Sequence, residues 1–220
     1  FTTPGTYTIT MKVGNRCGID QIIKTICIES PLVPQFSLST TEGCSPLTVS
    51  TSNNTNLTNV CTGNPSYLWN VTYTSGYCSS TLSYTLLNGT TLTSFAPEFN
   101  FINPGTYNIT LRTTNSCGSV TSPIQTVTIK KPPTAIINPI TNICQTFPNT
   151  TINPTAIIGN CGTQSPTYLW NFTGGIPDTS TSPTPTISYS TPGTYTITLA
   201  VTNECGTTTA TPITFTIKPT

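Results

Sequence analysis

Cysteine is the side chain through which this sequence has the most chemistry to offer. The chain has nine cysteines among its 220 residues and no histidine. No two cysteines stand in the Cys-x-x-Cys spacing of a metal site, and no imidazole is present to complete one. Cysteines used in this way form disulfides in an oxidising compartment. The sequence therefore predicts disulfides, an extracellular location, and no metal or cofactor.

Acid–base catalysis has few residues to draw on. Without histidine, no serine or cysteine can be activated as a nucleophile in the usual way. The acidic residues stand singly along the chain and form no paired motif. They are Asp20, Glu29, Glu42, Glu98, Asp178 and Glu204. We therefore expect a protein that is not an enzyme.

The charge composition restricts the partners. Seven basic and six acidic residues give a net charge of +1, too weak a field to gather nucleic acid or an anionic membrane. The sequence also lacks an apolar run long enough to span a bilayer, a start methionine and a signal peptide. We expect no nucleic acid, no membrane insertion, and an interior piece of a longer chain.

One segment of seventeen residues occurs three times in closely similar form. It reads TPGTYTITMKVGNRCGI from Thr3, NPGTYNITLRTTNSCGS from Asn103 and TPGTYTITLAVTNECGT from Thr191. Apolar and polar residues alternate after each Pro-Gly, which is the pattern of a half-buried strand. Each copy therefore predicts a turn, a strand and a second turn that carries a cysteine.

The repeat divides the chain into three units: residues 1–30, a complete unit at 31–131 and another at 132–220. Each complete unit has one Tyr-Leu-Trp-Asn sequence, and its other short strands are separated by turn residues, with no helical periodicity. This predicts an all-β chain of tandem immunoglobulin-like antiparallel sandwiches, of which the first is only a C-terminal fragment. The expected core signature is Trp69, Trp170, Tyr7, Tyr107 and Tyr195.

The second unit has an insertion at about 73–92 that the third unit lacks. It contains an Asn88-Gly89 pair, which predicts an extra hairpin closed by a two-residue turn. Aromatic side chains on such a loop can stack on sugar rings or contact a protein, or they can simply cover an edge strand. The candidate binding residues are Tyr73, Tyr77, Tyr84 and Leu86.

The order of these motifs resembles the PKD domain. The resemblance rests on Cys44 to Val49, on Tyr-Leu-Trp-Asn, and on Pro-Gly-Thr-Tyr followed by the cysteine turn, and it covers nearly the whole chain. More narrowly, it resembles the cysteine-bearing PKD-like repeats of giant surface proteins of Bacteroidota, including gliding-motility adhesins secreted by the type IX system. PKD domains usually have Trp-Asp-Phe-Gly-Asp-Gly, whereas this chain has Asn171 after Trp170, so the acidic loop through which some PKD-like modules bind calcium is missing.

The resemblance implies a stalk or spacer of a cell-surface adhesin. Its expected partners are neighbouring repeats of the same longer chain, with a surface polysaccharide or an envelope protein as a further partner. Two alternatives stay open: a carbohydrate-binding accessory module of a secreted hydrolase, and a protein-docking scaffold on the cell envelope.

The sandwich topology also suggests disulfide partners. The loop before the tryptophan strand and the turn after the repeated strand lie at the same end of a unit, so we expect Cys61–Cys117 and Cys161–Cys205. The alternative pairs cysteines seventeen apart, Cys44 with Cys61 and Cys144 with Cys161. In the first scheme Cys44 and Cys78 bond to each other, the partner of Cys17 precedes the first residue, and Cys27 and Cys144 remain unassigned.

Overall fold

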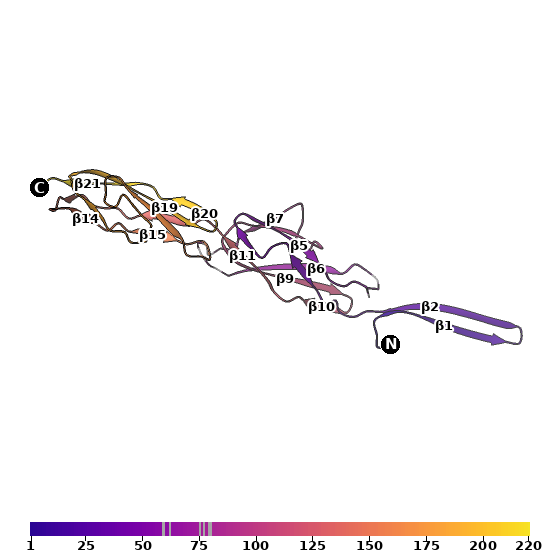
Figure 1. Cartoon of the computed structure of the whole chain (residues 1–220). Coiled ribbons are helices and arrows are strands. Elements are labelled where there is room, and N and C mark those ends of the chain that lie inside the picture. The colour runs from indigo at the N-terminus through magenta and orange to yellow at the C-terminus, as the bar shows by residue number, and fades with distance from the viewer. Residues whose placement is uncertain (59, 62, 75, 77, 79–80) are drawn as a thin grey trace.

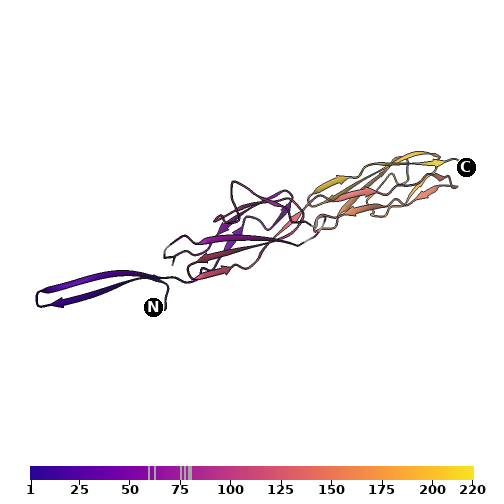
Figure 2. The same cartoon turned by 180° about the vertical axis from the view of Figure 1, so that it is seen from behind.

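The chain folds as a row of three β units. The computed structural model spans residues 1–220 and describes all of them except 59, 62, 75, 77 and 79–80. Figure 1 and, from behind, Figure 2 show a long hairpin at one end and two sandwiches after it, placed end to end. Every regular element in the described part of the chain is a strand, as the alternating pattern predicted. None of the described residues forms a helix that could cross a membrane.

The first unit is a two-stranded hairpin. Its strands pair in one unbroken register, from Gly5 opposite Ile28 to Asn15 opposite Gly18. The apolar face of the hairpin is open: Met11 is 59% exposed, whereas Leu111, at the same place in the second unit, is fully buried. The hairpin is thus the repeated strand and its return strand without a facing sheet. The strands are β1 (Gly5–Asn15) and β2 (Gly18–Ile28).

The open hairpin predicts a specific pattern of proteolysis. A two-stranded hairpin is at best marginally stable in water, so Lys12, Arg16 and Lys24 are expected to be cut by trypsin well before Arg112, which lies inside a larger sheet. Mass spectrometry of a timed digest should show a persistent product that begins at Thr25. Cleavage after Arg112 before Arg16 would contradict this description of the hairpin.

The second unit is a two-layer sandwich. In the first layer β9 lies between β6 on one edge and β10 and β11 on the other, and β4 runs parallel to β11. The second layer has the order β3-β5-β8-β7. The strands are β3 (Phe36–Leu38), β4 (Glu42–Cys44), β5 (Leu47–Asn53), β6 (Ser66–Thr74), β7 (Tyr84–Leu86), β8 (Glu98–Phe101), β9 (Gly105–Asn115), β10 (Gly118–Thr121) and β11 (Gln125–Lys130).

The described residues of the insertion in the second unit form no separate hairpin, although the sequence predicted one. Asn88 and Gly89 do form a tight turn, with positive φ values of 54° and 68° and a bond from the Thr90 N–H to the Leu87 carbonyl. The strand before this turn, β7, pairs with β8 and extends the existing sheet. The apolar residues of β7 explain this, because they lie against the core of the second layer.

The third unit repeats the sandwich, with its second layer divided into two pairs of strands. Its main sheet has the order β13-β21-β19-β16-β17, with β20 also on β19, and β12–β15 and β14–β18 form two short pairs of strands. The strands are β12 (Thr134–Ile137), β13 (Ile143–Cys144), β14 (Thr150–Ile152), β15 (Ala156–Gly159), β16 (Thr167–Phe172), β17 (Thr179–Ser180), β18 (Ile187–Tyr189), β19 (Gly193–Asn203), β20 (Gly206–Thr209) and β21 (Ile213–Lys218).

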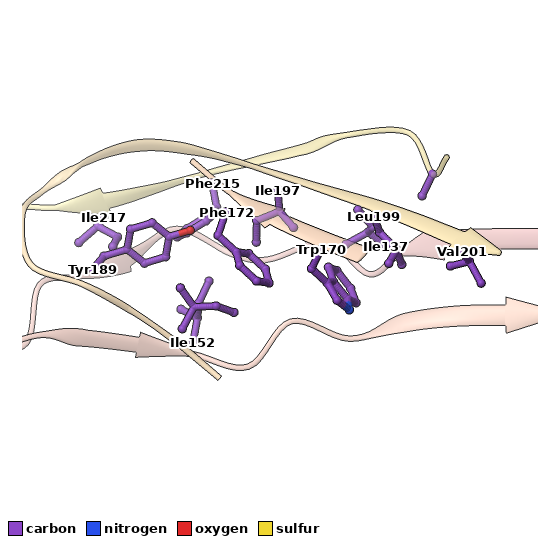
Figure 3. Close-up of a cluster of buried hydrophobic side chains, with 12 residues drawn as sticks. Ile137, Ile152, Trp170, Phe172, Tyr189, Ile197, Leu199, Val201, Phe215 and Ile217 are labelled. Atoms are coloured by element: carbon purple, nitrogen blue, oxygen red, sulfur yellow. The ribbon is translucent and has the colours of Figure 1, made fainter. Parts of the chain in front are cut away.

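Each sandwich has its own core. In the second unit Trp69 and Tyr107 are buried beside Phe99 and Phe101. In the third unit Trp170 and Phe172 stack with ring centroids 5.9 Å apart, among the aliphatic side chains that Figure 3 shows. The two clusters share no residue. The sandwiches therefore gain their hydrophobic stabilisation separately, and whatever holds them in a row must lie at their ends.

The tyrosine of the repeated segment has the same local role in all three units. Its hydroxyl donates to the carbonyl four residues earlier: Tyr7 to Thr3 at 2.7 Å, Tyr107 to Asn103 at 2.9 Å, and Tyr195 to Thr191 at 2.6 Å. This bond closes the Pro-Gly turn on the strand that follows it. Tyr107 is fully buried, whereas Tyr7 and Tyr195 are half-buried.

Candidate functional site: the junctions between units

Among the described residues there are three disulfides, and each of them joins two different units. Cys27 of the hairpin bonds Cys61 of the second unit, and two disulfides, Cys44–Cys205 and Cys78–Cys161, link the second unit to the third. The predicted pairs Cys61–Cys117, Cys161–Cys205 and Cys44–Cys78 are therefore wrong, and so is the alternative of pairs seventeen apart. Cys17, Cys117 and Cys144 are free and exposed.

The error has a physical reason. The predicted partners do lie at the same end of their unit: the Glu29 carboxylate accepts from both the Cys61 N–H and the Ser116 hydroxyl, next to Cys117. That end, however, faces the preceding unit, and the cysteine that meets Cys61 there is Cys27. Disulfides need Cα atoms about 4.4–6.8 Å apart, and the three observed bonds, at 5.1–5.6 Å, satisfy this across the junctions.

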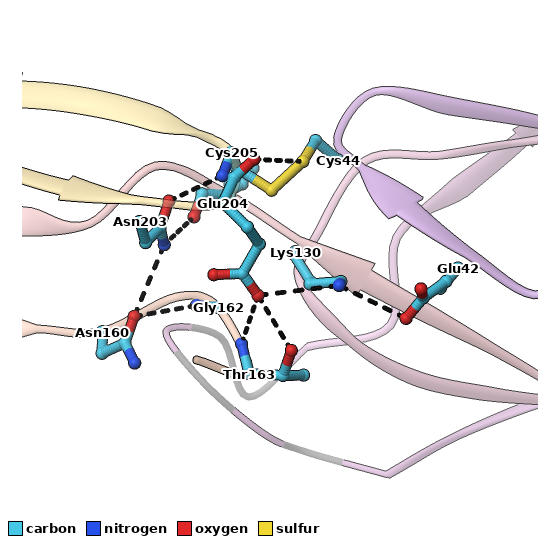
Figure 4. Close-up of a disulfide and its surroundings, with 10 residues drawn as sticks. Glu42, Cys44, Lys130, Asn160, Gly162, Thr163, Asn203, Glu204 and Cys205 are labelled. Atoms are coloured by element: carbon cyan, nitrogen blue, oxygen red, sulfur yellow. Dashed lines mark hydrogen bonds and ion pairs between the residues drawn. A yellow bond between two sulfur atoms is a disulfide. The ribbon is translucent and has the colours of Figure 1, made fainter. Parts of the chain in front are cut away.

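The junction of the second and third units is built around the turn at Asn203–Gly206 (Figure 4). The Asn203 Oδ1 atom accepts from the Cys205 N–H at 2.9 Å, and its Nδ2 atom donates to the Lys131 carbonyl of the linker at 2.8 Å. Gly206 has a φ of +133°, which lets the chain turn back into β20. One asparagine thus shapes the turn and fixes the linker to it.

Further backbone bonds leave the linker little freedom. The Lys131 N–H donates to the Cys161 carbonyl at 2.9 Å, and the Thr208 hydroxyl donates to the Pro133 carbonyl at 2.6 Å. The Lys-Lys-Pro-Pro linker is also stiff because proline fixes φ. The linker is therefore bonded along its length to the third unit.

Lys130 and Glu204 form an ion pair beside the Cys44–Cys205 disulfide. The Lys130 Nζ atom lies 3.6 Å from Glu204 Oε1 and 3.3 Å from Glu42 Oε2. The Lys130 side chain is 10% exposed and that of Glu204 16%. The Glu204 carboxylate lies close against the backbone of Gly162. A Cβ atom at position 162 would lie only 2.4 Å from Glu204 Oε2, so a larger residue there would displace the carboxylate. This lysine connects a carboxylate from each of two units.

Hydrogen bonds hold the Glu204 carboxylate in its ionised form. Desolvation raises the pKa of Glu204, but donors from Thr163, the Glu204 backbone and Gln164 outweigh it and lower that pKa from 4.5 to about 2. The Thr163 N–H and hydroxyl lie 2.6 Å and 2.8 Å from Oε1. A carboxylate with several donors is stabilised in this way.

The lowered pKa of Glu204 predicts an acid-sensitive junction. Its stabilising contribution is complete above the ordinary pKa of 4.5 and is lost as the pH falls toward about 2. From about pH 5 to about pH 2, the thermal midpoint should therefore fall further in the wild type than in Glu204→Gln. Calorimetry at several pH values measures this. Glu42→Gln is the control and should keep the wild-type pH profile, because Glu204 is still present; equal slopes in all three proteins would refute the role of Glu204.

The junction of the hairpin and the second unit repeats the same plan. The Asn115 Nδ2 atom donates to the Ser30 carbonyl at 2.8 Å, as Asn203 does to Lys131. The Ser116 hydroxyl donates to the Glu29 carboxylate. Glu29 has the sequence position that Lys130 has in the next junction, and Ser116 has that of Glu204. The same turn therefore binds the preceding linker at both junctions, with different charges in the same places.

The predicted binding loop contains no aromatic platform among its described residues. The Tyr73 hydroxyl donates to the Pro104 carbonyl, and its ring lies edge-on to Tyr107 at 5.0 Å. Tyr84 packs on Phe99 and Phe101, and Leu86 lies in the same core. Burial also raises the pKa of the Tyr84 hydroxyl. Tyr77 lies outside the described residues. Tyr73, Tyr84 and Leu86 thus cover an edge of the sandwich, the other role considered for them.

Sequence reasoning missed the residues that build the junction: Asn203, Glu204, Lys130 and Glu42. A signal for one of them was present, since an asparagine stands two residues before the cysteine in all three copies of the repeat. In the part of the chain that the structure describes, no group of three or more cysteine, aspartate or glutamate side chains could hold a metal.

Comparison with known proteins agrees with this architecture. Residues 148–214 match the model of the PKD domain family. No curated protein sequence matches the chain. The family match thus lies within the third unit, from the residues before β14 into the start of β21.

Among solved structures, a fragment of titin with three immunoglobulin domains is similar to this chain. The match covers 99% of this chain and 75% of the titin fragment, with 13% identity and a TM-score of 0.48. The D00-D0 domain of intimin covers 83% of the chain and 99% of its own length, with 11% identity and a TM-score of 0.46. Eight immunoglobulin domains of Down Syndrome Cell Adhesion Molecule cover 99% of the chain and 28% of their own length, with 12% identity and a TM-score of 0.44. At these scores the fold assignment rests on the strand topology of the chain itself.

Proposed function

We propose that this chain is a non-catalytic segment of an extracellular stalk, which holds a binding region of a large surface adhesin away from the cell. The observation that carries the proposal is that each disulfide in the described part of the chain crosses a junction between units. A disulfide inside a sandwich would stabilise that sandwich alone. A disulfide between sandwiches fixes their order and spacing, which is what a spacer under tension needs.

The ends of the chain and its surface fit this role. The tip of the hairpin and the C-terminus lie at opposite ends of the row, so further units that contact either end would lengthen it (Figure 1). The N-terminus itself lies at the base of the hairpin. Only 6% of the residues are charged, so neighbouring stalks have little electrostatic attraction for each other. Disulfides also require an oxidising compartment. The parent we propose is a cell-surface adhesin of the Bacteroidota gliding-motility type, secreted by the type IX system, with neighbouring repeats as its partners.

A replacement experiment in the source cells tests this function. The segment 31–220 is exchanged for two unrelated immunoglobulin-like domains of similar length. A spacer predicts that adhesion to the natural surface persists, and that antibodies against the original segment label intact wild-type cells. Lost adhesion despite normal surface display would favour a binding role, toward a polysaccharide or an envelope protein. Labelling only after permeabilisation would refute the extracellular location.

A further inference from the structure

The far end of the third unit has the backbone geometry of the end that carries Cys44. In the second unit β4 runs parallel to β11, with Cys44 opposite Lys130. In the third unit β13 runs parallel to β21, with Cys144 opposite Lys218. The backbone N–H of the residue after each cysteine donates to the backbone carbonyl of the lysine opposite. These bonds run from Ser45 to Lys130 at 2.7 Å and from Gln145 to Lys218 at 2.9 Å. Cys144 is nevertheless a free, exposed thiol.

The partner of Cys44 shows which kind of turn binds at this end of a unit. Cys205 lies in an Asn-x-Cys-Gly turn, the sequence that follows the repeated strand in all three units. Each turn has the same internal bond, from the cysteine N–H to the asparagine Oδ1, at 2.8, 3.1 and 2.9 Å for Cys17, Cys117 and Cys205. The turn thus has this internal bond without a disulfide, since Cys17 and Cys117 are free.

The occupied end also has an ion pair between the lysine and the turn. At the occupied end, Lys130 pairs with Glu204, the residue before the turn cysteine. Lys218 has the position of Lys130, opposite the strand cysteine in the parallel pair. An acidic residue before the turn cysteine would meet Lys218 favourably, and a basic residue would be repelled.

We propose that Cys144 and Lys218 form a docking site for a further module of this kind, which inserts an Asn-acid-Cys-Gly turn and is then fixed by a disulfide. The inference rests on the proposed stalk and its oxidising compartment, and it adds the partner and the chemistry of the joint. The site is more than a lone thiol, because the surroundings of Cys44 have the same strand pairing, the same lysine and the same backbone bond. At Cys44 the partner cysteine, Cys205, is in place.

The covalent step is a thiol–disulfide exchange. The Cys144 thiolate attacks the turn cysteine when that cysteine carries a mixed disulfide with a small thiol such as glutathione. A bond forms between the two protein sulfurs, the bond to glutathione breaks, and glutathione leaves as a thiolate that takes up the proton lost by Cys144. Overall, two protein thiols and one glutathione disulfide give one protein disulfide and two glutathione thiols.

A second copy of the chain serves as the probe. The hairpin turn has the sequence Asn15-Arg16-Cys17-Gly18. The hairpin and the C-terminus lie at opposite ends of the molecule, so two copies can meet head to tail (Figure 1). The wild type sets Arg16 against Lys218, which is repulsive. Arg16→Glu and, separately, Lys218→Glu each create an attractive pair, and the double variant Arg16→Glu/Lys218→Glu is repulsive again.

In a glutathione redox buffer, each single variant should form Cys17–Cys144 linked oligomers in about fivefold higher yield than the wild type and the double variant. Peptide mapping without reductant identifies the linkage. Cys144→Ser should abolish the oligomers in either attractive variant, whereas Cys117→Ser should leave them unchanged.

Equal yields in all four charge combinations, no oligomers in any of them, or links only between two copies of Cys144 would overturn the docking site. The same peptide maps report on the bond between Cys44 and Cys205 within each chain. If that bond is present and the Cys17–Cys144 linkage is absent, this inference fails alone. If the Cys44–Cys205 bond is itself absent, the proposed stalk loses its supporting observation.

Discussion

A molecule of this chain pulled by its two ends will extend about 550 Å further with its disulfides reduced than with them intact. The Cys44–Cys205 bond bypasses a sequence separation of 161 residues, and an extended chain spans about 3.3–3.6 Å per residue. With the bond intact, force passes directly from β4 to the turn before β20, and most of both sandwiches is shielded from it. Single-molecule force spectroscopy with and without a reductant measures the difference.

Two variants make this measurement specific. Cys205→Ser should give a gain well below that of full reduction, because Cys27–Cys61 and Cys78–Cys161 still bypass other parts of the chain. Cys117→Ser removes the cysteine of the corresponding turn in the second unit, which is free, and should extend like the wild type. Equal extension of the oxidised and reduced wild type would show that the disulfides do not carry the load between units.

Trp170→Ala should lower the free energy of unfolding of the third unit by about 3–5 kcal/mol, the range for removal of a large aromatic side chain from a core. Trp170 is fully buried, and its Nε1 atom donates to the Ser182 carbonyl at 3.1 Å. The substitution leaves a cavity beside Phe172 and an acceptor without its donor. Hydrogen exchange under increasing denaturant, followed by mass spectrometry, measures the loss in peptides of β19.

The second unit provides the internal reference for this experiment. Because the two cores share no residue, peptides of β9 should keep their protection in Trp170→Ala. Leu169→Ala, on the same strand but at a side chain that is 47% exposed, should change the stability of either unit by at most about 0.5 kcal/mol. Equal loss of protection in both units would mean that they unfold as one body.

The sequence predicted the strands well because their signal is local. Alternation after Pro-Gly identified β1, β9 and β19, and the Tyr-Leu-Trp-Asn sequence identified β6 and β16 with their buried tryptophans. These patterns are decided by which face of a strand is buried within its own unit, and burial leaves a period-two pattern in the residues.

The junctions could not be predicted in the same way, because their geometry depends on how separate units meet. Cys61 and Cys117 lie at one end of a unit, and only the presence of Cys27 in the adjacent hairpin decides which bond forms. Glu204 offers no local signal either, since its partners Thr163 and Lys130 are distant in sequence. The Asn-x-Cys-Gly repetition was the clue that could have been followed.

Mass spectrometry of the purified, unreduced chain after proteolysis tests most directly the claim that covalent bonds lock neighbouring units together. We predict linked peptides that contain Cys44 with Cys205 and Cys78 with Cys161, and unlinked peptides for Cys117 and Cys144. Linkage of Cys161 to Cys205, or of Cys61 to Cys117, would place the bonds inside single sandwiches and contradict the account.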